Sequence, residues 1–179
     1  MHLSQEAPLE TQPGIQIPVT VYRPGPIGGD YANGTLIALS DHGRAELVND
    51  EVVKEAHRKG WAVFAVDPRG IGEMKLADEN SAKVASFQLG EYFPWRQATD
   101  VARIIAFIAR PTAERRSAVY AKGPKSTFIA TLLAATTEAE WILLRDPAPS
   151  LEVNSPFYPN FDLKTLLQNP KFVNAPRFE

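Results

Sequence analysis

Three consecutive residues, Ser40, Asp41 and His42, carry side chains of the kinds that serve as nucleophile, acid and base. Nucleophilic catalysis needs such groups within hydrogen-bond reach of one another. Consecutive residues at the end of a strand point to opposite faces, so these three side chains cannot converge into a relay. The other histidines are His2 and His57, and no histidine follows His57. We therefore expect Asp41 or His42 to bond nearby backbone, and His57 to be a solvated surface residue.

The composition excludes several other kinds of chemistry. The chain of 179 residues contains no cysteine, which excludes disulfides, thiolate catalysis and zinc–thiolate sites. A net charge of -2 and a pI of about 6.0 do not favour nucleic-acid or membrane partners. The sequence shows neither a signal-peptide pattern nor an apolar run long enough to span a bilayer. We expect a soluble protein that needs no metal and no cofactor, and its compartment stays open.

Apolar runs alternate with amphipathic segments along the chain. Continuous apolar runs predict strands buried on both faces, and apolar residues at helical spacing predict helices. The predicted strands are 35–40, 61–66, 117–121 and 141–144, and the predicted helices are 51–59, 95–108 and 124–137. Strands that alternate with helices form a mostly parallel sheet with helices on both faces. The fold class is therefore an α/β three-layer sandwich.

The chain is long enough for one domain, which we place over residues 1–179. Within it we expect an N-terminal arm at 1–13, an excursion from the sheet at 71–94 and a C-terminal tail at 148–179. Residues 15–22 alternate like a strand that is exposed on one face, and Pro18 favours a position at the sheet edge.

Ligands of such sheets gather at the carboxyl ends of the strands. The candidate ligand-binding residues at those ends are His42, Gly43, Arg44, Lys122 and Gly123. Lys122 and Lys125 flank a helix N-terminus, where free amides can hold an anion. The alternative is that both lysines are simply solvated. Carboxylates at strand ends form turns more often than they bind metals, so no metal site is assigned.

Two of these loops resemble loops of the α/β-hydrolase superfamily. His42 and Gly43 follow an apolar strand, and the motif DPRGIG follows the next strand at 67–72. The opening segment, 14–24, is similar to that of acetyl xylan esterases and dienelactone hydrolase-like members. The resemblance extends to about residue 147 and implies a truncated α/β-hydrolase fold. It also implies that the His-Gly loop lies at an oxyanion hole.

Members of that superfamily carry their nucleophile in a Gly-x-Ser-x-Gly turn between a strand and a helix. The predicted elements place this turn on residues 121–125, so that Gly123 holds the nucleophile position. Glycine suits the strained backbone of the turn but has no nucleophilic atom. The next residue, Pro124, has no N–H to donate to an oxyanion. The resemblance therefore implies a scaffold without its catalytic centre.

Two residues could substitute for missing catalytic groups. Ser126 could be the nucleophile, but serine in the first turn of a helix usually caps the helix or faces solvent. Asp146 could be the acid, but an Asp-Pro pair more often forms a turn. The family's catalytic histidine follows the last strand, and this chain has no histidine after His57.

We expect an α/β-hydrolase-like pseudoenzyme that binds a small molecule or has a structural role. The alternative is a carboxylic ester hydrolase, similar to acetyl xylan esterases, with an unconventional nucleophile or completed by another chain or a missing C-terminal segment. The family has two more strands beyond the position of 141–144. An uncovered edge there invites pairing, so we expect either a monomer whose tail folds back over it or a homodimer through that edge.

Overall fold

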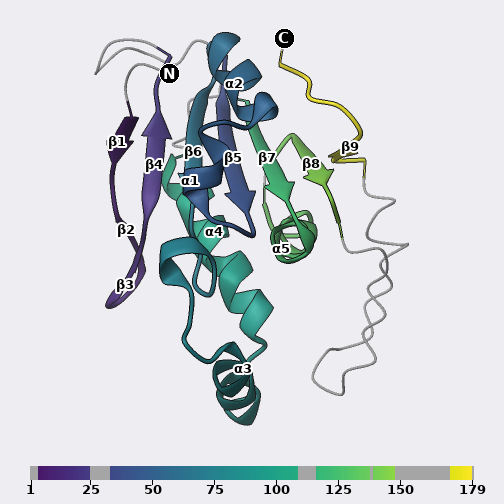
Figure 1. Cartoon of the computed structure of the whole chain (residues 1–179). Coiled ribbons are helices and arrows are strands. Elements are labelled where there is room, and N and C mark those ends of the chain that lie inside the picture. Colours follow the sequence, from purple (N-terminus) through teal and green to yellow (C-terminus); the bar gives the residue numbers. More distant parts are fainter. Residues whose placement is uncertain (1–3, 25–32, 109–115, 138, 148–169, 179) are drawn as a thin grey trace.

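A seven-stranded sheet forms the centre of the molecule, with the strand order β1-β4-β6-β5-β7-β8-β9 (Figure 1). The computed structural model describes residues 4–24, 33–108, 116–137, 139–147 and 170–178. The strands are β1 Ser4–Glu6, β4 Val19–Tyr22, β5 Thr35–Ser40, β6 Ala62–Val66, β7 Ser117–Lys122, β8 Trp141–Arg145 and β9 Phe172–Val173. Strands β6, β5, β7, β8 and β9 are parallel, whereas β1 and β4 are antiparallel to their neighbours. The predicted, mostly parallel α/β sheet is confirmed.

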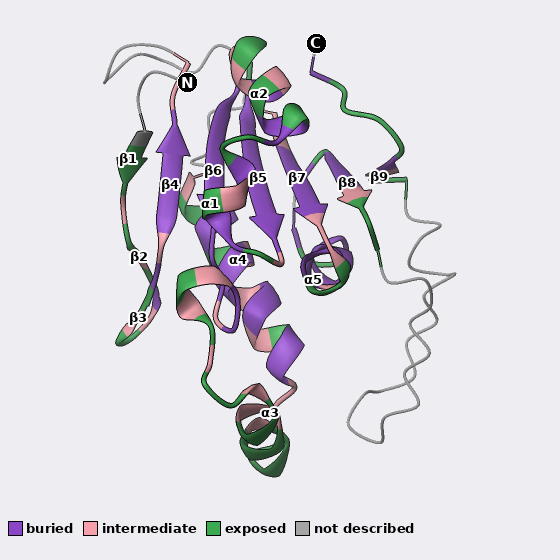
Figure 2. Cartoon of the chain, viewed as in Figure 1, coloured by how far each residue is buried: buried purple, intermediate pink, exposed green. Residues whose placement is uncertain are grey.

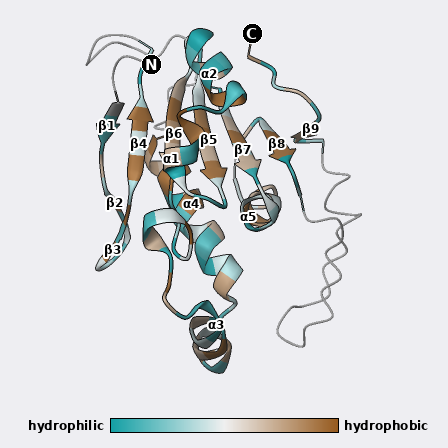
Figure 3. Cartoon of the chain, viewed as in Figure 1, coloured by the Kyte–Doolittle hydropathy of each residue, from teal (hydrophilic) through white to brown (hydrophobic). Residues whose placement is uncertain are grey.

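Helices cover both faces of the sheet, because the central strands have apolar side chains on both faces. The helices are α1 Arg44–Leu47, α2 Glu51–Arg58, η1 Gly72–Met74, α3 Glu79–Gln88, α4 Phe93–Ile108 and α5 Pro124–Leu133. Leu36 and Ala38 of β5 lie in one core cluster with the buried face of α2. Ile37 and Leu39 of the same strand lie in a second cluster with α4 and α5. Successive side chains of one strand therefore serve two helical layers, which explains its continuous apolar run (Figure 3).

Helix α2 begins and ends where the sequence predicts. The carboxylate of Asp50 accepts hydrogen bonds from the amides of Val52 at 2.9 Å and Val53 at 3.5 Å, and so caps the first turn. Gly60, with a φ of 80°, follows the last turn. Two other helices differ from the prediction at one end, since α4 begins two residues earlier, at Phe93, and α5 ends at Leu133 instead of residue 137.

The prediction of one edge strand over 15–22 is wrong. Pro18 separates β3, Ile15–Ile17, from β4. Strand β3 forms a two-stranded hairpin with β2, Leu9–Gln12, whereas β4 lies between β1 and β6 in the main sheet and is buried throughout. The N-terminal arm expected at 1–13 thus contains two strands, one of which covers β4.

Residues 71–94 contain η1, α3 and the beginning of α4. Helix α3 projects beyond the carboxyl ends of the parallel strands, and none of its residues is buried (Figure 2). Among the described residues, no helix combines the length and the apolar character that crossing a membrane requires.

The end of the chain returns to the sheet. The amide of Ile142 donates to the carbonyl of Lys171 at 2.6 Å, and β9 pairs in parallel with β8. Further on, the ring of Phe178 packs on Trp61 and Trp141, with centroids 5.3 Å apart in both pairs. Residues 172–173 thus pair with part of the β8 edge, and the choice between a folded-back monomer and a homodimer stays a prediction. Residues 148–169 lie outside the described part.

Candidate functional site

The turn from β7 to α5 has the geometry that the sequence predicts. Gly123 joins the strand to the helix with a φ of 94° and a ψ of 161°, and Pro124 occupies the first turn of α5. This φ lies in the region that strongly favours glycine. Proline is tolerated at this position because the first amide of a helix has no partner within the helix. Residue 123, the position of the family's nucleophile, therefore has no side chain. The following residue, Pro124, has no N–H to donate.

A carboxylate of the chain itself lies at the turn around Gly123, between β7 and α5, which we call the elbow. Asp41, which follows β5, accepts hydrogen bonds from the backbone amides of Lys125 at 3.0 Å and Ser126 at 2.7 Å. These amides lie in the first turn of α5, where the helix dipole favours a negative charge. Asp41 thus bonds backbone, as expected, but the backbone is that of α5 and not the nearby loop that the sequence suggested. Its partners are 84 and 85 residues away along the chain.

The carboxylate also fills the space that a side chain at residue 123 would need. A Cβ atom added to Gly123 would lie 2.6 Å from Cγ of Asp41 and 2.9 Å from its Oδ2. Real Cβ atoms essentially never approach other heavy atoms so closely. A serine at this position would therefore have to displace the side chain of Asp41.

Ser126 and Asp146, the two candidate substitutes, lie in different environments. Ser126 is fully buried, with 0% exposure, so its hydroxyl does not face the solvent side of the elbow. Asp146 is exposed and adopts a φ of 52°, which is uncommon for a residue other than glycine. The left-handed backbone of Asp146 agrees with the turn that the Asp-Pro pair predicts.

The loop after β5 is held by Asp67 at the end of β6. Its carboxylate accepts hydrogen bonds from the amides of Arg44 at 2.7 Å and Glu73 at 3.0 Å. Burial raises the pKa of the Asp67 carboxyl, while these two amides lower it. Gly72 is required beside it, because a Cβ atom there would lie 2.2 Å from Oδ2 of Asp67. Asp67, the first residue of the DPRGIG motif, thus connects the loop after β5 with the turn at Glu73. Gly72, the last residue of the motif, leaves room for the carboxylate of Asp67.

Arg69, the arginine of the same motif, forms a buried ion pair that the sequence did not predict. Arg69 forms a two-pronged ion pair with the fully buried Asp100 of α4, with both N–O distances at 2.7 Å. The hydroxyl of Thr11 donates to the same carboxylate at 2.8 Å. The hydrogen bond with Asp100 raises the pKa of Arg69. The pair fixes the β6 turn, α4 and the β2–β3 hairpin to one another.

The predicted ligand residue Arg44 is directed inward. Its guanidinium is almost completely buried and contacts Glu6 at 3.0 Å and Glu73 at 2.5 Å, and it also donates to Thr20. His42 is exposed beside it, and its amide donates to the hydroxyl of Ser40 at 3.2 Å. The structure therefore separates His42 and Arg44, and their ligand role stays a prediction.

The two lysines at the elbow pair with internal carboxylates. Nζ of Lys122 lies 2.7 Å from Glu46, and Nζ of Lys125 lies 2.5 Å from Glu79 of α3. The hydrogen bond with Glu46 raises the pKa of Lys122, and the same bond lowers the pKa of Glu46. The expected anion site thus already contains the chain's own carboxylates. In the described part of the chain, no cluster of His, Asp and Glu side chains is arranged to hold a metal.

Solved structures with this architecture identify the fold. A Bacteroides fragilis protein named as an acetyl xylan esterase matches with a TM-score of 0.60 and 12% identity, over 76% of this chain. The chain has an α/β-hydrolase fold. DcsB in complex with a substrate analogue matches with a TM-score of 0.57 and 18% identity over 79% of the chain. A thermostable carboxyl esterase from Bacillus coagulans matches with a TM-score of 0.55 and 15% identity over 80%.

The same comparisons show the limits of the likeness. The chain spans 42%, 45% and 44% of the lengths of these three proteins, in the order given. No family model and no curated protein sequence matches it. The predicted resemblance is thus confirmed at the level of the fold, whose structural neighbours are esterases and other hydrolases.

Proposed function

We propose that this chain is a non-hydrolytic α/β-hydrolase-fold domain with a binding or structural role. One observation carries the proposal: the carboxylate of Asp41 occupies the elbow beside Gly123 and accepts hydrogen bonds from the first amides of α5. Ester hydrolysis at this position would need a nucleophile where the chain has a glycine. It would also need an oxyanion donor where the chain has Pro124.

The charge at the elbow argues in the same direction. An acyl-transfer transition state develops negative charge, which enzymes stabilise with hydrogen-bond donors aimed at the oxygen. Loss of one donor typically reduces turnover by about 100- to 1000-fold. Here Pro124 removes one donor, and Asp41 both occupies the next two amides and places a negative charge beside them. The local field would therefore oppose an oxyanion.

The competing function is a carboxylic ester hydrolase with an unconventional nucleophile, or one completed by another chain or segment. Its support is the fold, which the chain shares with esterases. The burial of Ser126 speaks against that residue as the nucleophile. Asp41 is partly exposed and has a carboxylate, so it is the candidate nucleophile at the elbow if such an enzyme uses a group of this chain.

A chromogenic ester assay separates the two functions. The native chain, Ser126→Ala, Asp41→Ala and a heat-denatured sample are incubated with p-nitrophenyl acetate and p-nitrophenyl butyrate. We expect all four samples to release p-nitrophenol at the same rate. A saturable rate in the native chain that either substitution abolishes would replace the binding role with the hydrolase and name its nucleophile.

A further inference from the structure

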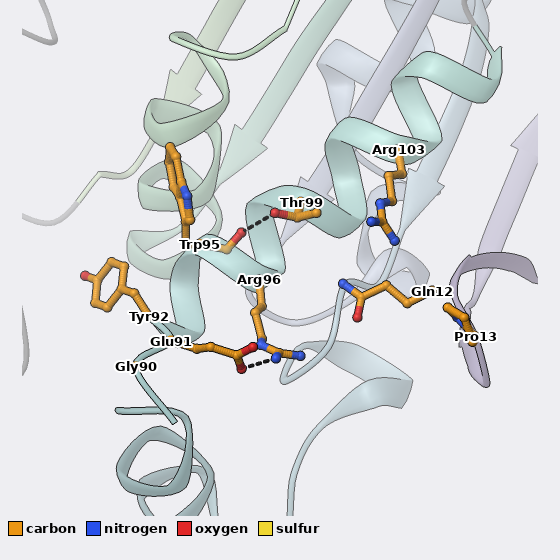
Figure 4. Close-up of a pocket in the computed structure, with 9 residues that line it drawn as sticks. All are labelled: Gln12, Pro13, Gly90, Glu91, Tyr92, Trp95, Arg96, Thr99 and Arg103. Carbon is orange, nitrogen blue, oxygen red and sulfur yellow. Dashed lines mark hydrogen bonds and ion pairs between the residues drawn. The ribbon is translucent and has the colours of Figure 1, made fainter. Parts of the chain in front are cut away.

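A groove with a volume of about 590 Å³ lies between α4 and the turn of the β2–β3 hairpin (Figure 4). Its volume falls within the range of ligand pockets in proteins. None of its lining residues belongs to the elbow or to the loops that follow β5 and β6. The groove is therefore a separate feature, and what it binds does not depend on whether the elbow hydrolyses esters.

Helix α4 supplies one wall of the groove through a regular stripe of side chains. Tyr92, which precedes the helix, and Arg96, Thr99 and Arg103 follow one another at intervals of three or four residues. Such intervals place side chains on one face of a helix. The opposite face, including Val101, is buried in the core. The helix thus presents a polar and cationic stripe on the side that faces away from the core.

The groove contains two guanidinium groups and one carboxylate. In Figure 4 the side chains of Arg96 and Arg103 approach the space beside Gln12, on the hairpin turn. One N–H of Arg103 donates to the carbonyl of Thr11, and a guanidinium has five N–H donors in all. The arginines are about 10.5 Å apart along the helix axis, because each residue rises about 1.5 Å. The groove can therefore receive two acidic groups at separate points.

The carboxylate in the groove is Glu91, which forms an ion pair with Arg96. The side chains of Arg96 and Glu91 are 33% and 38% exposed. Solvent-exposed pairs of this kind contribute about 0–1 kcal/mol, so an incoming carboxylate can exchange with Glu91. The internal pair shows that Arg96 is placed to accept a carboxylate from the solvent side.

An exposed aromatic residue precedes Arg96 in the lining of the groove. Trp95 is 44% exposed, and in Figure 4 its ring points to a different side of the helix turn from the guanidinium of Arg96. Leu89, which precedes Gly90 of the lining, is 76% exposed. Exposed tryptophan is enriched in the central anchor positions of binding surfaces. An apolar side chain of a ligand would cover Trp95 while acidic groups reach the arginines.

We propose that the groove binds an acidic peptide segment in an extended conformation, with a bulky apolar residue at Trp95 and carboxylates at Arg96 and Arg103. The stripe from residue 92 to residue 103 is about 16 Å long. About five residues of extended chain span that length, at about 3.3 Å each. Two arginines that can bind carboxylates in bidentate fashion favour acidic side chains along the segment.

Fluorescence anisotropy of a labelled peptide tests this proposal. The probe is a blocked hexapeptide with one phenylalanine followed by glutamates and aspartates, made in both chain directions. We expect Arg96→Gln and Arg103→Gln each to weaken binding by about three- to tenfold. Arg58→Gln, a change of an exposed arginine on α2, is the matched control and should leave binding unchanged. Circular dichroism checks that each variant is folded.

Glu91→Gln supplies a test in the opposite direction. Removing the internal competitor should tighten binding of the acidic peptide by about twofold to threefold, whereas Glu55→Gln on α2 should have no such effect. A peptide with glutamine and asparagine in place of the acids should bind much more weakly. Equal binding of the two peptides, or unchanged binding in both arginine variants, would refute the proposal. Binding that needs only the phenylalanine would show an apolar docking site and also refute it.

Discussion

The elbow and the α4 groove each contain a carboxylate of the chain that meets hydrogen-bond donors, but the two contacts differ in kind. At the elbow, Asp41 accepts from two backbone amides whose positions α5 fixes. In the groove, Glu91 pairs with Arg96 through two side chains that are each about one-third exposed. A contact with fixed backbone donors is part of the fold, whereas a contact between partly exposed side chains can be exchanged. The difference is what we expect if the elbow has a structural role and the α4 surface is the binding region, as proposed above.

The largest expected effect concerns residue 123. Gly123→Ala should lower the free energy of unfolding by about 3 kcal/mol, because it combines a left-handed backbone with a close contact to Asp41. Gly14→Ala is the matched control, since Gly14 has a φ of +76° and no atom within 4 Å of an added Cβ. It should cost only the backbone strain, about 1 kcal/mol. Urea unfolding compares the two, and equal losses would mean that Asp41 does not fill the elbow.

Removal of Asp41 gives the next largest effect. Asp41→Ala should lower the free energy of unfolding by about 1–2 kcal/mol, because it leaves the first amides of α5 without their acceptor. Asp41→Asn should lose less, since its side-chain oxygen still accepts a hydrogen bond. In the Gly123→Ala background, Asp41→Ala should cost less than it does alone, since the crowding is relieved. Strict additivity in the double variant would contradict the close contact.

The ion pair between Lys122 and Glu46 should make the stability of the folded chain depend on pH. The hydrogen bond from Lys122 lowers the pKa of Glu46 in the folded chain. The stabilisation is therefore complete above the ordinary pKa of glutamate, about 4.3, and is lost as the pH falls through the lower pKa of the folded state. Thermal unfolding between about pH 6 and pH 3 should show a steeper loss in the native chain than in Glu46→Gln. Parallel curves would exclude a contribution from this pair.

The smallest effect on stability is expected in the groove. Glu91→Gln should change the free energy of unfolding by less than about 0.5 kcal/mol, because both partners of the pair are solvated. Glu55→Gln, which breaks an exposed pair on α2, should behave in the same way. A loss comparable to that of Asp41→Ala would show that Glu91 is also part of the fold and would remove the contrast between the two regions.

Local signals made much of this structure predictable. The apolar run at 35–40 predicted β5, and Pro124 after the strand at 117–121 placed the elbow at Gly123. Pro18 leads to a wrong prediction, because a proline between two strands of different sheets gives the same local signal as a proline in an edge strand. The contact of Asp41 with α5 could not be predicted in this form, because its partners lie 84 and 85 residues away. Such a contact depends on strand order and helix placement, which spacing in the sequence does not encode.

The α4 groove could not be predicted from the sequence either, because its two walls come from distant parts of the chain. The helical pattern predicted the buried face of α4, since apolar residues at this spacing must pack on a sheet. The polar face of the helix gave no signal of its own, because charged residues on an exposed face are ordinary. What makes it a groove is the turn at Gln12 and Pro13, which belongs to a hairpin about ninety residues earlier in the chain.

The mutual exclusion of Asp41 and a side chain at residue 123 also constrains how this sequence can evolve. A serine at residue 123 meets Asp41, and loss of Asp41 alone leaves helix amides without a partner. Each single step is thus less stable than the present pair, so a route to a serine elbow passes through a disfavoured intermediate. Pro124 adds a third required change before an oxyanion donor could return. Selection for stability alone would therefore keep Asp41 and Gly123 together, whether or not the domain binds a ligand.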